Sequence, residues 1–547
     1  MRNILRRRPR PALTVVVAVY DVREYLTECF DSLAAQTFSD FEVIAVDDGS
    51  SDGSGAWLDE RARVEPRLRV IHQRNRGLGA ARNRGVKRAR GEFLTFLDPD
   101  DVLPPRAYEK LVGSLRRSGS ALAVGAIERF EDGDEDRWQS RWSRVAHARA
   151  RSAVTLTEAP EALLDIVACN RVVRRDVWRT VVGAFPTGVV YEDHLPVLRL
   201  YLDGGPFDIL SETTYLWRRR GDESSLGQRK HELQNLLDRV TAKRHGLAAV
   251  DAHGDETVSR WYVSRVLSVD LPPFLRGAAD PVASEEYWRA ARDFARVFVE
   301  RAQAAPAVWD YPEPHQRVSA WLAAEDRRGD LNLLSEAALE QGRARLPTRA
   351  QQGDVLLDLP ALGVESSDVP RALLVLDPSD TTLRMTVLDV ATDEDALVVT
   401  GRARLRRLPG AQLTALDLGL RVAPEAPRAE PGEDALVHGS ATIAPVDPAV
   451  APGCDVVVRF PLDEVRAAVS GGRVLWLTGT GTADGVTREL GVVETAMGGR
   501  LRGQGLQLAE GIYARRSRNG FDVRDRPFAP SAGAPERPGT GQLSDTP

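Results

Sequence analysis

A regular alternation of apolar runs and helix-like stretches between residues 12 and 115 constrains the fold more than any other feature. Short apolar runs typical of buried strands occupy residues 14–20, 41–50, 68–73 and 92–98. Strands joined by intervening helices of this length form right-handed crossovers and lie parallel in one sheet. The sequence therefore predicts an α/β, Rossmann-like domain.

The pattern changes twice further along the chain. Residues 229–352 show the 3.6-residue period of amphipathic helices and are predicted to be a helical connector. Residues 353–512 contain strand-like runs separated by Gly, Pro and Asp, typical of an immunoglobulin-like β-sandwich of one or two modules. The α/β domain is assigned to residues 12–228. The remaining parts are a basic tail at 1–11 and a tail without regular structure at 513–547.

Composition narrows the class of protein. The chain has 547 residues and three scattered cysteines without a CxxC pair, which excludes a disulfide framework and favours a reducing compartment. No apolar run reaches the length of a membrane span. We therefore predict a cytoplasmic protein. The arginines of residues 1–11 either contact anionic lipid at the inner face of the cell membrane or form a solvated tail.

Polar residues gather where the predicted strands end. Tyr20, Asp48, Arg76 and Asp98 each lie at or shortly after the end of one of the four strands. In a parallel sheet the carboxyl ends of the strands meet at one edge, where ligands bind. We therefore expect these side chains to line one binding site.

The segment FLDPDD gathers Asp98, Asp100 and Asp101 around Pro99. Carboxylates this close repel one another unless a cation or another partner lies among them. Asp98 and Asp100 offer the oxygen ligands that Mg2+ or Mn2+ prefers, and substrate phosphates often complete such sites. The alternative is a solvated turn, because Asp and Pro are good turn residues. Asp101 is expected to support the site rather than to bind the ion.

Two further segments suit a nucleotide. In VDDGSSDGS, Asp48 is placed to accept hydrogen bonds from a base or a ribose, although a helix cap explains the same residues. RNRGLGAARNRG opens a helix with glycines and with Arg76 and Arg82, which suits a diphosphate. Arg82 stands where the dinucleotide fingerprint needs its third glycine, so that fingerprint is excluded. A solvated basic face is the alternative.

Two later segments offer candidate catalytic and loop residues. YEDH places Glu192 and Asp193 at the start of a predicted helix, where a carboxylate can act as a general base. Acidic residues are also favoured there without a catalytic task. WRRRGDESS, from Trp217 to Ser225, is a basic loop with a glycine hinge that either closes over phosphates or is a solvated run of charge.

The order and spacing of AVYD, VDDGSSDGS, RNRGLGAARNRG, FLDPDD and YEDH resemble the family 2 glycosyltransferases of the GT-A fold over residues 12–228. The resemblance implies a nucleotide-sugar site at the strand ends and transfer of the sugar with inversion. For the donor, the resemblance implies that Ala18 and Tyr20 border the nucleoside, that Asp48 binds the base, and that Arg76 and Arg82 lie near the base or the diphosphate. It implies that Asp98 binds the ribose and the metal and that Asp100 binds the metal. It also implies that Asp193 is the general base with Glu192 beside it, and that Arg218, Arg219 and Ser224 belong to a closing loop.

The chain departs from the family pattern in two places. Many members read PVYN where this chain has Ala18 and Asp21, which affects the first loop only. The QxxRW motif and transmembrane helices of the processive membrane members are absent from this sequence. Trp217 with its neighbouring arginines resembles the substitute loop of members without those helices.

The helical connector and the β-rich region resemble, in architecture, the wall teichoic acid glycosyltransferases, whose C-terminal domains help to form trimers. The resemblance implies a nucleotide-sugar donor, UDP-GlcNAc by family default, and a bound Mn2+ or Mg2+. It also implies a polymeric acceptor, such as teichoic acid or another polysaccharide, and a homo-oligomer. A nucleic-acid partner is not expected.

Two other functions remain open on the sequence. The β-rich region would also suit a glycan-binding or assembly protein with a degenerate transferase domain, although Asp98, Asp100 and Asp193 are all retained. A nucleotidyltransferase also combines a parallel sheet with metal-binding carboxylates, but its usual Gly-rich start with an activating lysine is missing.

Overall fold

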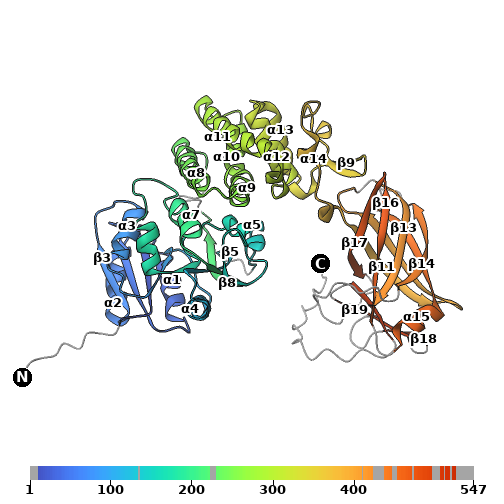
Figure 1. The fold of residues 1–547 in the computed structure, drawn as a ribbon, viewed down its shortest axis with the longest axis horizontal. Helices are drawn as coiled ribbons and strands as arrows, with labels where there is room; N and C mark the ends of the chain where they lie inside the picture. The colour runs from blue at the N-terminus through green and yellow to red at the C-terminus, as the bar shows by residue number, and fades with distance from the viewer. Residues whose placement is uncertain are drawn as a thin grey trace, which may run out of the picture. The chain divides into compact units, whose positions relative to one another are not determined.

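The computed structural model describes residues 10–132, 136–221, 229–408, 411–422, 436–445, 453–470, 474–495, 506–509, 512–517 and 520–524. The chain divides into two compact units, residues 1–335 and 336–547 (Figure 1). Each unit is described by itself.

Unit 1 is built on an eight-stranded sheet in the order β3-β2-β1-β4-β7-β5-β8-β6. The strands are β1 (Leu13–Val19), β2 (Phe41–Asp47), β3 (Leu68–His72), β4 (Phe93–Leu97), β5 (Leu122–Glu131), β6 (Arg151–Val154), β7 (Arg171–Arg174) and β8 (Phe207–Arg219). The first four strands are mutually parallel, and every residue of β1, β2 and β4 is buried because helices cover both faces. The predicted α/β fold is confirmed.

The register of these strands aligns their carboxyl ends. Val19 of β1 lies opposite Asp47 of β2, and Val17 lies opposite Leu97 of β4. The polar residues that follow each strand therefore emerge at one edge of the sheet. The helices of this part are α1 (Leu26–Ala34), α2 (Ser54–Val64), α3 (Leu78–Val86), α4 (Ala107–Ser118), α5 (Arg141–Ala146), α6 (Arg175–Val177) and α7 (His194–Asp203), with short turns η1 (Pro160–Leu164) and η2 (Trp178–Val182).

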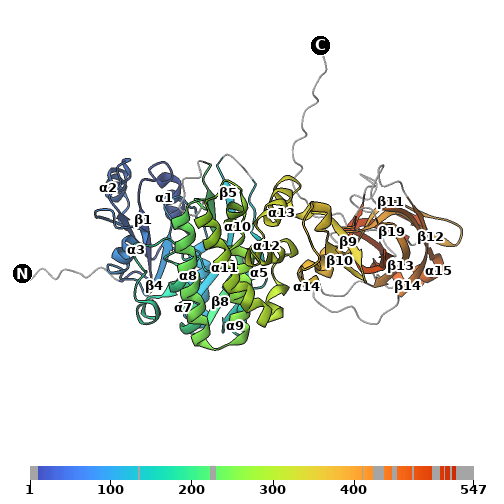
Figure 2. The same cartoon turned by 90° about the horizontal axis from the view of Figure 1, so that it is seen from above.

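A second group of helices packs onto this domain (Figures 1 and 2). It consists of α8 (Leu233–His253), α9 (Glu256–Arg265), η3 (Val266–Asp270), α10 (Pro272–Ala279), α11 (Glu285–Ala304), α12 (Pro314–Ala324) and α13 (Arg328–Glu340). Helix α8 contacts α7, and α9 contacts η1, so most of the predicted helical connector belongs to the same compact unit as the sheet. Among the described residues, no helix combines the length and apolar character needed to cross a bilayer.

Unit 2 is mainly β-structure, as predicted. It begins with a hairpin of β9 (Thr348–Gln351) and β10 (Asp354–Leu357), followed by the short helix α14 (Arg371–Leu374). Seven further strands form a closed sheet, because β13 pairs with both β14 and β16. These strands are β11 (Leu383–Thr392), β12 (Ala396–Leu405), β13 (Leu413–Val422), β14 (Leu436–Pro445), β15 (Cys454–Pro461), β16 (Val474–Ala483) and β17 (Val486–Thr495), with α15 (Leu462–Val469) between β15 and β16.

The end of unit 2 corrects one prediction. Three more strands, β18 (Leu506–Ala509), β19 (Ile512–Ser517) and β20 (Gly520–Arg524), extend the sheet from β16. The prediction that residues 513–547 lack regular structure is therefore wrong for β19 and β20. Val523 of β20 is buried, but polar residues interrupt the short apolar stretches of this region, so the sequence shows no apolar run typical of a strand. Residues 525–547 lie outside the described part of the chain.

Candidate active site

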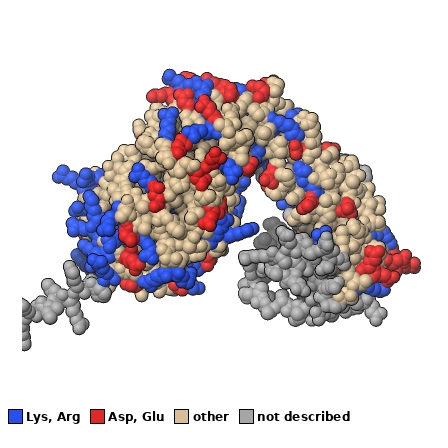
Figure 3. All heavy atoms as spheres, viewed as in Figure 1, with Lys and Arg blue, Asp and Glu red and all other residues tan. Residues whose placement is uncertain are grey.

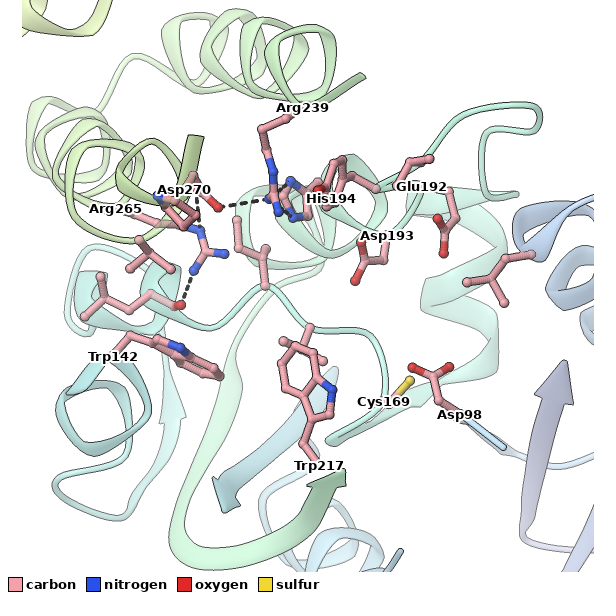
Figure 4. Close-up of a pocket in the computed structure, with 18 of the residues that line it drawn as sticks. Asp98, Trp142, Cys169, Glu192, Asp193, His194, Trp217, Arg239, Arg265 and Asp270 are labelled. Carbon is pink, nitrogen blue, oxygen red and sulfur yellow. Dashed lines mark hydrogen bonds and ion pairs between the residues drawn. The ribbon is translucent and has the colours of Figure 1, made fainter. Parts of the chain in front are cut away.

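A pocket of about 400 Å³ opens at the carboxyl edge of the unit 1 sheet (Figure 4). One wall carries Asp98, which follows β4, and Cys169. Opposite them, Glu192 and Asp193 lie at the start of α7. The pocket continues past Trp217 towards the helices α8 and η3. It therefore joins the predicted donor edge of the sheet to a region that the motifs did not include.

Arg82 of α3 connects the two acidic groups of the pocket. Its buried guanidinium donates to Asp98 Oδ1 at 2.7 Å and to Glu192 Oε1 at 2.5 Å. Burial raises the pKa of Glu192 to about 7; Arg82 opposes this rise, and the neighbouring Asp193 adds to it. Arg82 thus holds the end of β4 and the start of α7 together, whereas the sequence placed it near a base or diphosphate.

Asp193 is the N-cap residue of α7 and lines the pocket. Burial raises the pKa of its carboxyl group above the ordinary value, while the charges of Arg82 and Arg239 oppose the rise. A carboxylate with a raised pKa is a stronger base than an exposed one, so this side chain can accept a proton from a hydroxyl group in the pocket.

Glycine positions α3 against the segment that leads into α7. Gly77 begins the helix with a φ of 85°, and a Cβ on Gly79 would lie 2.1 Å from the carbonyl oxygen of Pro186. Asn83 adds two hydrogen bonds to Phe185, one to its carbonyl and one from its amide, each 2.8 Å long. These close contacts let Arg82 reach Glu192.

The acidic FLDPDD segment is divided among three environments. Asp98 faces the pocket with its side chain 34% exposed. Asp100 accepts a hydrogen bond at 2.8 Å from Arg220 Nε. Asp101 is buried and accepts from the Tyr215 hydroxyl at 2.5 Å and from the Arg218 backbone N–H at 2.8 Å. Asp101 therefore joins the turn to β8, in agreement with a supporting role.

Asp98 and Asp100 have the donor chemistry of a divalent-cation site. Each uses one carboxylate oxygen towards an arginine, through Arg82 and Arg220 respectively. Two carboxylates fit an ion whose remaining ligands are phosphates and water. Within the described residues, no group of three or more His, Cys, Asp or Glu side chains forms a metal cage. Asp98 and Asp100 stay the predicted ligands, and Arg220 competes for Asp100.

The residues predicted to contact the nucleoside lie at the same edge. Ala18 is buried near the end of β1, Tyr20 is 49% exposed, and the Arg76 side chain is exposed. The carboxylate of Asp48 accepts hydrogen bonds from Gln73 and from the backbone of Arg76 and Gly77. Asp48 therefore shapes the loop before α3. Lysine and arginine side chains gather over β3, α2 and α3 (Figure 3, left), beside this loop.

The loop arginines have different surroundings from those predicted. Arg218 is buried between the rings of Tyr25 and Phe130, and its guanidinium pairs with Glu28 and Asp132. Arg219 is exposed and pairs with Glu131 at 3.1 Å. Both line the pocket, but Arg218 has a structural role as well. Ser224 lies outside the described residues.

Motif analysis missed a cationic end of the pocket. Four of its lining residues are Arg129, Lys230, Arg239 and Arg265. Arg129 Cζ lies 4.7 Å from the centre of the Trp217 ring, and the buried Nε of Arg129 has no hydrogen-bond partner in the described part of the chain. Burial lowers the pKa of Lys230 to about 7, helped by the charge of Arg239. The sequence carries no local signal for this group, because three of its members come from the helical connector.

The cationic end is organised around Asp270, the last residue of η3. Burial disfavours its charge, but Arg265, Lys243 and Arg239 hold the pKa of this carboxyl group down at about 2. Lys243 approaches Asp270 at 2.7 Å and Arg239 at 3.0 Å. Arg239 also donates to His194 at 2.9 Å, which connects the cluster to α7 (Figure 4).

The comparisons with known proteins define the class of unit 1. Residues 14–181 match the sequence model of the glycosyl transferase family 2. The putative glycosyltransferase EpsH of Bacillus subtilis is 40% identical over 122 residues, 22% of this chain and 36% of EpsH. The glycosyltransferase GlyG of Streptococcus pneumoniae is 27% identical over 215 residues, 38% of this chain and 71% of GlyG. Residues 14–181 thus match the family 2 glycosyltransferases, the family that the motifs resemble.

Beyond residues 14–181, the fold of this chain is similar to the crystal structure of S. aureus TarS. That crystal structure superposes with a TM-score of 0.55 and 17% identity, over 94% of this chain and 85% of TarS. At this identity the similarity shows the fold alone. The chain covers only about a third of the length of EpsH, the first curated relative. The shared fold confirms the predicted order of an α/β domain, helices and a C-terminal β-rich unit.

Proposed function

We propose that this chain is an inverting glycosyltransferase that moves a sugar from a nucleotide-sugar donor to a hydroxyl group of a cell-envelope polymer. One observation carries the proposal: Asp193 and Glu192 face Asp98 across a single pocket, and Arg82 bridges Glu192 and Asp98. Asp98 and Arg82 belong to the residues that match the family 2 model. The proposed base, Asp193, then lies opposite Asp98 at the end of β4, where the donor is expected to bind.

The reaction that suits this geometry is a single displacement. Asp193 takes the proton of the acceptor hydroxyl while its oxygen bonds to the anomeric carbon of the sugar. The bond between that carbon and the donor phosphate breaks on the opposite face, so the configuration inverts. A divalent cation on Asp98 and Asp100, when bound, supplies positive charge to the departing diphosphate. Arg82 keeps Glu192 beside the base.

The donor side of the proposal rests on the strand edge. Tyr20 and Arg76 are exposed there, and α3 begins directly after the loop that carries Arg76, so the N-terminus of this helix lies at the same edge, where it would favour an anionic diphosphate. We propose a UDP-sugar, with UDP-GlcNAc as the first candidate.

The acceptor side rests on the cationic end of the pocket. Arg129 is half-buried, its buried Nε has no hydrogen-bond acceptor among the described residues, and Lys230 and Arg265 line the same space. A buried guanidinium favours an anionic partner. A poly(polyol phosphate) of the teichoic type presents both hydroxyl groups and phosphates, and we propose this class of acceptor. Assembly through unit 2 and peripheral contact with the inner face of the membrane remain predictions.

The test is a donor screen with Mn2+ that measures release of the nucleoside diphosphate with and without a teichoic-type acceptor. In Asp193→Asn the base is lost, so transfer should fall by a factor on the order of 10² to 10⁴ while donor affinity is kept. Asp203→Asn, an exposed acid at the end of the same helix, is the matched control. Transfer by Asp193→Asn at the rate of this control would refute the assignment.

The metal site is tested separately. In Asp100→Ala, donor affinity should lose its dependence on Mn2+, because one of the two oxygen ligands is gone. A titration of UDP-GlcNAc with and without Mn2+ measures this effect. Equal Mn2+ dependence in wild type and Asp100→Ala would show that Asp100 does not hold the ion.

A further inference from the structure

A large basic groove lies in unit 2, within residues 345–484. Its volume is about 1080 Å³, and it is bordered by β9, the start of β11, the end of β12 and the turn after β12. Among the described residues that line it, the one acid is Asp484. The arginines that line it are Arg345, Arg349, Arg384, Arg404, Arg406 and Arg407.

The strand register concentrates this charge. In the antiparallel pairing of β11 with β12, Arg384 lies directly opposite Arg404. Ala403 and Leu405 are buried, so Arg404 and Arg406 emerge together on the other face of β12. Like charges directly opposite one another destabilise a sheet. The pairing of Arg384 with Arg404 is therefore unfavourable in itself, and a polyanion bound across the two strands would relieve it.

Two arginines of unit 2 outside the groove have carboxylate partners at short distance. Arg402 pairs with Asp455 at 2.9 Å, and Arg459 pairs with Asp393 at 2.5 Å. In the groove, Arg406 is 3.9 Å from Asp380. The acids Asp393, Glu394 and Asp395 form the turn at the opposite end of the β11–β12 hairpin. The hairpin is thus basic at its open end and acidic at its turn.

The lining also restricts the kind of ligand. None of the described residues that line the groove is aromatic. Single-stranded nucleic acids bind largely by stacking bases on aromatic side chains, so a groove without them lacks the main contact for bases. Guanidinium groups, by contrast, bind phosphate oxygens with two parallel hydrogen bonds. Arg404 near the end of β12 and Arg406 just after it line the same groove, so they can contact neighbouring phosphates of an extended chain.

We propose that this groove binds an extended phosphodiester polymer without bases, a poly(polyol phosphate). The inference rests on the proposed function in one respect: it assigns to unit 2 the same polymer class that the catalytic pocket would glycosylate. Unit 2 would then retain a long acceptor between transfers. A second site on one chain raises the effective concentration of the polymer at the first.

The binding experiment uses the full chain and fluorescent poly(glycerol phosphate), without donor. Arg384→Gln/Arg404→Gln should weaken binding about tenfold or more, and the slope of log K against log salt should fall by about 2. The matched control is Arg402→Gln/Arg459→Gln, which removes the same charge from arginines that have close carboxylate partners. Its affinity should stay within about twofold of wild type.

Several outcomes would overturn the proposal. The first is an equal loss of affinity for the polymer in both double variants. The second is wild-type affinity in Arg384→Gln/Arg404→Gln, and the third is an affinity that does not depend on salt concentration. Equally tight binding of single-stranded DNA would assign the groove to nucleic acid instead, and equally tight binding of neutral dextran would assign it to uncharged glycan. The midpoint temperature of thermal unfolding of Arg384→Gln/Arg404→Gln should be no lower than that of the wild type, because the substitutions remove a repulsion between two arginines.

A transfer experiment separates this inference from the proposed function. The groove variant should transfer normally to a single glycerol phosphate unit but lose the rate advantage of the long polymer. If neither acceptor is glycosylated by the wild type, the proposed function fails, while the binding experiment still decides the groove. If the groove variant keeps the full advantage of the long polymer, unit 2 does not retain the acceptor.

Discussion

At the scale of single residues, neighbouring acids have different surroundings. Asp98, Asp100 and Asp101 occur within four positions, yet one faces the pocket, one pairs with Arg220 and one is buried beneath Tyr215. Glu192 and Asp193 are adjacent, but Arg82 pairs with Glu192 at 2.5 Å. Chemical type alone would not separate these roles, because each depends on a partner far away in the chain.

The first prediction concerns the pH dependence of transfer. Asp193 must be ionised to act as a base, so activity should fall as pH drops through its raised pKa. The charge of Arg82 lowers the pKa of Asp193, and the carboxylate of Glu192 partly neutralises that charge through its ion pair with Arg82. Glu192→Gln should therefore move the acid limb of kcat/KM to lower pH, by about one unit. Glu92→Gln, which removes the partner of Arg174 at the other edge of the sheet, should leave the limb in place. A limb that moves to higher pH would contradict this coupling.

At the scale of elements, the site depends on how closely α3 approaches the segment before α7. A Cβ on Gly79 would lie 2.1 Å from Pro186 O, and backbone cannot move away as a flexible side chain can. This contact sets the position of Glu192 and hence of Asp193.

The second prediction tests this contact. Gly79→Ala should displace the segment and reduce kcat/KM on the order of 10²-fold, because small misplacements of catalytic groups are costly. Gly113→Ala in α4 is the control, since its Cβ would meet only the end of Arg117 at 3.3 Å. The control should gain up to about 1 kcal/mol of stability from the better helix propensity of Ala. Equal activity in the two variants would show that the approach of α3 does not position the base.

At the scale of the whole molecule, the helices after the transferase domain complete its pocket. Helix α8 brings Arg239 and Lys243 to Asp270 of η3, and Arg239 continues to His194 of α7. The helical group thus contributes charged side chains to the pocket as well as apolar contacts.

The third prediction concerns the stability of this cluster. Asp270→Asn leaves Arg239, Lys243 and Arg265 buried without their carboxylate, which should cost about 3–5 kcal/mol of unfolding free energy at neutral pH. The folded pKa of Asp270, about 2, lies below its unfolded value, so its contribution is complete above pH 4 and is lost as pH falls through about 2. The difference in unfolding free energy between wild type and Asp270→Asn should therefore narrow as the pH falls.

Chemical unfolding measures this difference, and the chain offers a matched control. Asp251→Asn breaks an exposed pair with Arg301 between α8 and α11, which should cost less than about 1 kcal/mol. A similarly small loss in Asp270→Asn would mean that the cluster does not anchor the helices to the domain.

The sequence alone was sufficient to predict the parallel sheet, the family of its domain and the β-rich second unit. Those features follow from local patterns: β-branched runs, helical periods and turn residues repeat along the chain. It also placed Asp48, Asp98 and Asp193 at strand ends or at a helix start. Tertiary structure decided the partners: Asp48 holds a loop, and Arg82 joins Asp98 to Glu192. It also brought Lys230 and Arg239 into the same pocket and set Arg384 against Arg404. These arrangements depend on contacts between distant segments and on strand register, which local periodicity does not specify.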